Sequence, residues 1–157
     1  MISPYGIIRA GTRRWAPPTE KTLHKKWRTQ IKAKTYIVKV AADGTVAREE
    51  FNHADPLGQL QAAVGGYIER VPTVRLRGHD LFVNEDGKIK DPNRINVPLT
   101  NHYNSTRRNC QWVVGDGVFA AHEPDGEARW LTEAECEAIE RMLARLGAKV
   151  AGKDAAR

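Results

Sequence analysis

The stretch TYIVKVAADGTVAREEF, residues 35–51, restricts the fold more than any other part of the sequence. Its first half places Tyr36, Val38 and Val40 on one side of an extended chain, as in a β-strand that buries one face. An Asp-Gly pair at residues 43–44 favours a tight turn, and a second β-prone segment follows it. The sequence therefore predicts a β-hairpin, and with it a sheet that is at least partly antiparallel.

Two helices are predicted to accompany this hairpin. In WLTEAECEAIERMLARLG, Thr132 and Glu135 form a capping box, and apolar residues recur at helical spacing up to Gly147. In HADPLGQLQAAVGGYIERV, Asp55 is an N-cap residue followed by proline, and the apolar pattern continues to Val71. This helix contains two adjacent glycines, each of which costs about 1 kcal/mol relative to alanine in a helix interior.

Further strands are expected in three segments. These are TVRLRG (73–78), HDLFVNEDGKIK (79–90) around its NEDG turn, and CQWVVGDGVFAAH (110–122), which indicates a strand pair or a bulged strand. Together with the hairpin and the helices, they predict an α+β fold with a small, mainly antiparallel sheet, two packed helices and a basic N-terminal arm.

The basic residues are concentrated at the N-terminus. Residues 1–34 carry nine basic side chains and one acidic side chain, a net charge of +8, whereas the whole chain of 157 residues carries +6. Within this segment Leu23, Trp27 and Ile31 recur at the spacing of a basic amphipathic helix. We therefore expect a basic arm over 1–34, an α+β domain over 35–147 and a flexible tail over 148–157. Such an arm can neutralise phosphates or an acidic protein surface, or it can be a solvated tail.

Several classes of protein are disfavoured by what the sequence lacks. No apolar run approaches the roughly 20 residues that span a bilayer, and the opening residues lack the features of a secretory signal, so we expect a cytoplasmic protein. Cys110 and Cys136 have no metal-ligand spacing, which predicts two reduced thiols and no metal site. P-loop, GxGxxG, GxSxG and HExxH motifs do not occur, so we assign no catalytic residue, no cofactor and no enzymatic activity.

The glycines of the predicted helix suggest a close approach by another group. On a helix that continues to Val71, a stripe of positions with hardly any side chains would end at Glu69. Either another element packs there, or a ligand binds there with Gln61 and Glu69 as polar rim groups. With two asparagines added from the resemblance described below, the candidate ligand-binding residues are Gly58, Gln61, Ala62, Gly65, Glu69, Asn84 and Asn96.

The segment DPNRINVPLTNHYNSTRRN, residues 91–109, has no clear periodicity and is predicted to be a long loop. Its amides, aromatic ring and arginines are the groups that hydrogen-bond bases, stack on them and hold phosphate or carboxylate. A soluble loop turned by asparagines is the alternative. The candidate nucleic-acid or partner-binding residues of the arm and this loop are Arg13, Arg14, Lys25, Lys26, Trp27, Arg28, Tyr103, Arg107 and Arg108.

Four motifs occur in a recognisable order: LQAAVGGYIERV, LFVNEDGKIK, NVPLT and WVVGDGVF. Over about residues 36–125 this series resembles the uncharacterised family catalogued as domain of unknown function 3846, which is frequent in phages, plasmids and other mobile elements. The resemblance supplies no activity, and it implies the role of a small accessory protein that occupies a partner. The residues that match the recurrent pattern are Gly65, Gly66, Glu69, Asn84, Glu85, Gly87, Asn96 and Gly115.

Three functions remain open from the sequence. The first is an accessory binding module, acting in the host cytoplasm if phage-encoded, whose arm and Arg107/Arg108 loop contact nucleic acid or an acidic host protein. The second is a protein that binds a small molecule or nucleotide on the glycine-rich helix face. The third is a virion or assembly component whose arm packs on a neighbouring subunit. The oligomeric state does not follow from the sequence.

Overall fold

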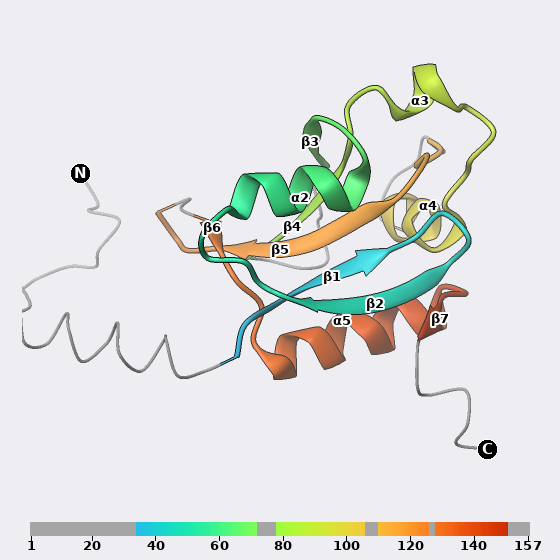
Figure 1. The fold of residues 1–157 in the computed structure, drawn as a ribbon. Coiled ribbons are helices and arrows are strands. Elements are labelled where there is room, and N and C mark those ends of the chain that lie inside the picture. The colour runs from blue at the N-terminus through green and yellow to red at the C-terminus, as the bar shows by residue number, and fades with distance from the viewer. Residues whose placement is uncertain (1–33, 72–77, 106–109, 126–127, 151–157) are drawn as a thin grey trace, which may run out of the picture. The chain divides into compact units, whose positions relative to one another are not determined.

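The computed structural model describes residues 34–71, 78–105, 110–125 and 128–150, and Figure 1 shows their arrangement. Its strands are β1 (Tyr36–Val40), β2 (Thr45–Glu50), β3 (Ile68–Val71), β4 (His79–Asn84), β5 (Gly117–His122), β6 (Ala128–Arg129) and β7 (Lys149–Val150). Its helices are α2 (Pro56–Val64), α3 (Gly87–Lys90), α4 (Val97–Asn104) and α5 (Glu133–Arg145).

Within the described residues, the seven strands form one sheet in the order β3-β4-β5-β1-β2-β7, with β6 paired to β5. Every pairing is antiparallel except that of β2 with β7. The predicted α+β fold with a mainly antiparallel sheet is therefore confirmed. The described part contains α3 and α4 in addition to the two helices that the sequence predicted.

The predicted hairpin forms as β1 and β2, in a register that pairs Tyr36 with Glu50 and Val40 with Val46. At the turn, Gly44 adopts a left-handed backbone with φ of +89°, which glycine allows without a steric cost. The Asp43 side chain accepts a hydrogen bond from the Thr45 amide at 2.9 Å and so braces the same turn. The Asp-Gly pair thus fixes the register of the two strands.

Helices cover both faces of the sheet, as Figure 1 shows, with α2 on one face and α4 and α5 on the other. Alternate residues of a strand point to opposite faces, and β1 is buried on both. Ile37 packs with Ala63 and Val64 of α2, whereas Val38 belongs to the larger cluster that includes Ile139 of α5. The hydrophobic core is therefore divided into two layers by the centre of the sheet.

The C-terminal helix has the caps that the sequence predicts. Thr132 and Glu135 form a reciprocal capping box, and Gly147 beyond the last turn has a φ of +95°. In the middle of the helix, the buried Glu140 accepts two hydrogen bonds from the Arg48 guanidinium of β2. This charge pair holds α5 against the hairpin.

The glycine-bearing helix is shorter than predicted. Helix α2 begins at Pro56 behind the Asp55 cap, as expected, but it ends at Val64. Gly65 is its left-handed C-cap with φ of +78°, and residues 68–71 continue as strand β3. The prediction of a helix to Val71 is wrong because a glycine C-cap ended the helix at a point where the apolar residues still followed helical spacing.

Three other segments differ from the predictions. The long loop predicted over 91–109 contains helix α4, which begins at Asn96 as N-cap. The segment GKIK after the NEDG turn is the short helix α3 and not a strand. In the tail predicted over 148–157, residues 149–150 form β7, where Val150 is buried beside β2.

The predicted strand over 73–78 lies outside the described residues except for Gly78, and the predicted amphipathic helix of the arm lies outside them entirely. In the ranges that the structure describes, no helix combines the length and the apolar character needed to traverse a bilayer.

Candidate functional site

The structure gives structural roles to most of the predicted ligand-binding glycine stripe. A Cβ atom on Gly58 would overlap the carboxylate of Asp55, so glycine here makes room for the helix cap. Gln61 supplies the carbonyl that accepts the Gly65 amide at 2.8 Å, and Ala62 is exposed on the helix. Because the helix ends at Val64, these positions do not form a continuous stripe with Glu69. The predicted ligand site on this helix face is therefore withdrawn.

Asn96 is a structural residue and not a ligand-binding one. Its side chain is fully buried, and its amide nitrogen lies 3.0–3.1 Å from the carbonyl oxygens of Val40, Ala41 and Gly115. Its side-chain oxygen accepts the Leu99 amide at 3.2 Å and caps helix α4. The prediction of a ligand site at Asn96 is wrong, because one amide satisfies buried backbone groups from three segments.

Three predicted residues do converge on one place. Glu69, Asn84 and Tyr103 line a groove of about 140 Å³ that lies at one side of the sheet. Its walls come from β3, the end of β4, α3, the end of α4 and the segment before Gly115. The other lining residues are Arg70, Val71, Val83, Glu85, Lys88, Gln111, Trp112, Val113 and Val114.

The floor and the wall of the groove differ in character. Val71 and Val83 pack on the core cluster beneath α4 and α5, so Glu69, two positions before Val71 on β3, belongs to that side as well. Glu85 follows the end of β4 and also lines the groove. The wall includes Trp112, whose side chain is 63% exposed, one of the most exposed large apolar residues of the described chain. The groove thus joins an apolar floor to carboxylates and an exposed aromatic ring.

Asn84 braces one end of the groove. Its amide nitrogen donates to the Val64 carbonyl at 3.3 Å, and its oxygen accepts the Asp86 amide at 2.9 Å. The same side chain lies against Gly66, where any larger residue would meet it. Asn84 therefore connects α2 to the turn between β4 and α3, and it borders the groove as a fixed group.

Two hydrogen bonds between Asn104 and Gln111 join the end of helix α4 to the segment that contains Trp112. The Asn104 amide donates to the Gln111 carbonyl at 3.1 Å, and the Gln111 amide donates to the Asn104 side-chain oxygen at 3.0 Å. This reciprocal pair holds together the chain on either side of residues 105–110. The predicted contact residues Arg107 and Arg108 belong to that segment, and they lie outside the described residues together with Arg13, Arg14, Lys25, Lys26, Trp27 and Arg28 of the arm.

Three charged groups of the groove form no ion pair with another described residue. Among the described residues, Glu69, Glu85 and Lys88 form no ion pair, whereas Arg70 lies 3.5 Å from the Asp80 carboxylate on the other face of the sheet. Unpaired charges beside an exposed indole are available to a ligand. The groove is thus the candidate binding site.

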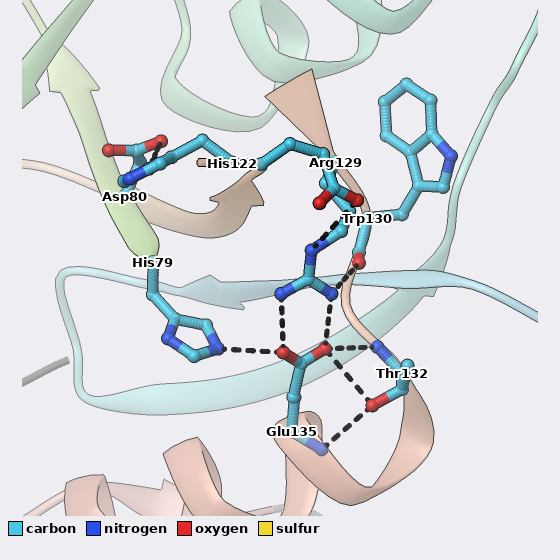
Figure 2. A network of polar contacts seen from close by, with 8 residues as sticks. His79, Asp80, His122, Arg129, Trp130, Thr132 and Glu135 are labelled. Carbon is cyan, nitrogen blue, oxygen red and sulfur yellow. Dashed lines mark hydrogen bonds and ion pairs between the residues drawn. The ribbon is translucent and has the colours of Figure 1, made fainter. Parts of the chain in front are cut away.

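A second polar cluster lies at the opposite end of β4, shown in Figure 2. The Arg129 guanidinium donates to both oxygens of Glu135, at 2.7 and 2.9 Å, and His79 lies 3.2 Å from the same carboxylate. Partial burial opposes ionisation of Glu135, but the hydrogen bonds from Arg129 and Thr132 outweigh it and lower the pKa to about 2. The pKa of Arg129 is raised in turn by its hydrogen bonds to Glu135.

On the other side of the sheet, the adjacent residue Asp80 accepts a hydrogen bond from His122 Nδ1 at 2.8 Å. Three of the contacts in this cluster join two elements: His79–Glu135 joins β4 to α5, Arg129–Glu135 joins β6 to α5, and His122–Asp80 joins β5 to β4. We interpret the cluster as a structural clamp at this end of the sheet.

Sequence reasoning missed Trp112, Gln111 and Lys88 as site residues. The segment that contains Trp112 has strand-like composition, which predicted a strand pair or a bulged strand and gave no reason to single out this residue. No pattern in the sequence distinguishes an exposed tryptophan from a packed one. Trp130 illustrates the difficulty, because its ring stacks on Phe51 with centroids 3.5 Å apart.

Comparison with known proteins identifies a family. The family model described as "Domain of unknown function (DUF3846)" matches residues 34–144, which is well over half of the chain. No curated protein and no solved structure matches the chain.

Proposed function

The chain belongs to the family described as the domain of unknown function DUF3846, and we propose on this premise that it is an accessory binding module of a phage or other mobile element, without enzymatic activity. One observation carries the proposal: an indole that is 63% exposed stands at the wall of a groove with unpaired charges. Exposed aromatic residues beside a hollow are characteristic of binding surfaces, where they supply contact area at a small entropic cost.

Binding is favoured over catalysis by the way the titratable groups are used. The carboxylate and imidazole groups that lie closest together, around Glu135 and Asp80, join elements of the fold and do not line the groove. These contacts stabilise the fold, so their geometry needs no catalytic explanation. The groove itself contains carboxylates without a paired imidazole among the described residues.

The size of the groove limits what it can hold. Pockets for small organic ligands usually measure about 300–1,000 Å³. At about 140 Å³, this groove suits one side chain or one ring of a larger partner, and not an entire nucleotide. A macromolecular partner that inserts a single group is therefore the interpretation that fits best.

The test compares full-length variants purified from the natural host by native mass spectrometry. We expect a partner to be retained by the unmodified protein and lost from Trp112→Ala. The matched control is Leu57→Ala, because Leu57 is also an exposed apolar residue, at 54%, but does not line the groove. If Trp112→Ala retains the same partner as the control, the groove is not the binding site and the proposal fails.

Nucleic-acid binding by the arm is the second candidate, and one observation favours assigning it to the arm alone. The whole chain carries a net charge of +6 and residues 1–33 carry +7, so residues 34–157 carry −1. Phosphate groups would be attracted by the arm, whereas the net charge of the remainder gives them no comparable attraction. Contacts with nucleic acid would therefore be made by the arm, with Arg107 and Arg108 as additional contacts.

A further inference from the structure

We infer that the partner of the groove is an extended, basic segment of another protein, which pairs with the free edge of β3 and places a lysine or arginine side chain in the groove. The inference rests on the proposed function, because it names the partner of the same site. It is carried by three features of the described residues: the orientation of the peptide groups in β3, the unpaired carboxylates and the exposed aromatic ring.

The hydrogen-bond pattern shows which peptide groups of β3 point outward. The Glu85 amide donates to the Tyr67 carbonyl at 2.9 Å, in a register that pairs Glu69 with Val83. In an antiparallel pair, hydrogen-bonded positions alternate, so residues 67, 69 and 71 direct their peptide groups toward β4. The peptide groups of Ile68 and Arg70 therefore point away from β4. Among the described residues β3 pairs only with β4, so no described strand occupies this edge.

The side chains of β3 determine which strand can pair there. Charged residues on an edge strand discourage pairing with strands that cannot compensate the charge. Glu69 is exposed and stands on the groove side, so a residue opposite it in an added strand would project over the groove. A cationic side chain at that position would neutralise Glu69 and approach Glu85. An acidic residue would be repelled by both.

The wall of the groove suits the same cation. A guanidinium or ammonium group is attracted to the face of an indole, and Trp112 is the exposed indole of this wall. The aliphatic part of a lysine or arginine would lie over the apolar floor formed by Val71 and Val83. Lys88 also lines the groove, but it is outnumbered by the two carboxylates, and Arg70 has Asp80 as its partner.

The charges that line the groove act in the same direction. Among its described lining residues, two carboxylates face the single ammonium group of Lys88, so an acidic strand would meet an unfavourable local potential. A basic strand is thus the occupant that agrees with the charge of the groove.

The experiment measures binding of fluorescent blocked pentapeptides to the full-length protein by anisotropy. The probe is Val-Arg-Val-Arg-Val, and its charge control is Val-Glu-Val-Glu-Val. A third peptide carries N-methyl groups on alternate residues of the basic sequence, which removes the donors that pair with β3. A six-nucleotide oligothymidylate tests the opposite ligand class.

We expect the basic peptide to bind, the acidic peptide to bind at least tenfold more weakly, and the N-methylated peptide to lose binding. The double variant Glu69→Gln/Glu85→Gln should weaken the basic peptide about fivefold, the size expected for two exposed ion pairs. Trp112→Ala should weaken it as well. Glu50→Gln, an exposed carboxylate of β2 outside the groove, is the matched control and should leave binding unchanged.

Equal binding of the acidic and basic peptides, or equal binding of the N-methylated peptide, would overturn the inference. Binding of the oligothymidylate that depends on Trp112 would also overturn it, while leaving the groove as the functional site. If Trp112→Ala retains the host partner and binds every probe as the unmodified protein does, the proposed function itself is overturned.

Discussion

Gly66 lies against Asn84 so closely that a Cβ atom on Gly66 would stand 2.8 Å from the Asn84 amide nitrogen. The amide cannot move aside freely, because it donates to Val64 and its oxygen accepts from Asp86. This contact explains the second glycine of the pair in the VGG segment as a packing requirement.

Replacing Gly66 by alanine is therefore expected to lower the free energy of unfolding by about 1–3 kcal/mol, the usual cost of overpacking. Gly65 has no atom within 4 Å of its added Cβ, but its φ is +78°. Gly65→Ala should thus cost about 1 kcal/mol through backbone strain alone. Urea unfolding of both variants measures these values.

The matched control for this pair is asparagine at each position. Asparagine is tolerated in the left-handed cap conformation, so Gly65→Asn should recover stability relative to Gly65→Ala. Gly66→Asn should recover none. If Gly66→Ala proves as stable as the unmodified protein, the contact with Asn84 does not restrict this position.

Asn96→Ala is expected to destabilise the protein by at least about 2 kcal/mol, because it leaves buried backbone carbonyls and the Leu99 amide without a partner. Asn101→Ala removes a hydrogen bond to the Leu146 carbonyl at an exposed site and should cost less than about 1 kcal/mol. Thermal and urea unfolding distinguish the two. Similar costs for both variants would contradict the structural role of Asn96.

The stability of the fold should depend on Glu135 at acid pH. Its pKa is about 2 in the folded protein and has an ordinary value of 4.5, so the stabilisation is complete above pH 4.5 and is lost as the pH falls toward 2. Because part of the side chain stays in solvent, we expect a contribution of about 1 kcal/mol. Urea unfolding at pH 6, 4 and 3 measures it.

Glu135→Gln should show a shallower loss of stability across this range than the unmodified protein. Glu137→Gln, an exposed carboxylate on the same helix, is the control and should keep the original pH profile. Parallel profiles for the unmodified protein and Glu135→Gln would refute the assignment.

The two cysteines should differ in reactivity. Burial raises the pKa of the Cys136 thiol to about 11, while Cys110 is exposed. Since the thiolate is the reactive form, a thiol reagent at pH 8 should modify one cysteine per folded chain and two in denaturant. Mass spectrometry should locate the first modification at Cys110. Rapid labelling of Cys136 in the folded protein would show that α5 opens readily.

The proposed arm contact with nucleic acid makes a prediction about salt. The affinity of the full-length protein for a DNA or RNA oligonucleotide should fall steeply with salt, because neutralised phosphates release counterions. Lys25→Gln/Lys26→Gln/Arg28→Gln should weaken binding and reduce the slope by about 0.9 for each lost duplex contact. Arg107→Ala/Arg108→Ala should weaken binding with a stability change within about 0.5 kcal/mol. Absence of binding at low salt would exclude this candidate.

The hairpin and α5 were predicted correctly because each carries a strong local sequence signal at its turn or caps. The hairpin has its Asp-Gly turn, and α5 has its capping box and its final glycine. The end of α2 was mispredicted because Tyr67, Ile68 and Val71 keep helical spacing after the chain has become a strand. Only the pairing of β3 with β4, a tertiary interaction, decides between the two.

Helix α4 was mispredicted for another physical reason. Its buried face includes Thr100 and His102, so the apolar periodicity that signals a helix is absent. Hydrogen bonds stabilise this helix instead. Asn96 accepts the Leu99 amide, and the Thr100 hydroxyl oxygen accepts the Val113 amide. Polar burial of this kind depends on partners that are distant in the sequence.

The candidate site was predicted only in fragments. Glu69, Asn84 and Tyr103 were identified, but as members of three different features, and their convergence follows from the order of β3 and β4 and the position of α4. Trp112 could be identified as a site residue only from its exposure, which no sequence pattern supplies.

The reciprocal hydrogen bonds between Asn104 and Gln111 make the intervening residues a natural place for variation in length. The pair fixes both stems, so a change in the number of residues between them should leave the rest of the fold unchanged. Closing a loop of twice the length costs only about 0.6 kcal/mol more. A foreign peptide epitope could thus be grafted between Asn104 and Gln111 for display, and we expect the fold to tolerate it.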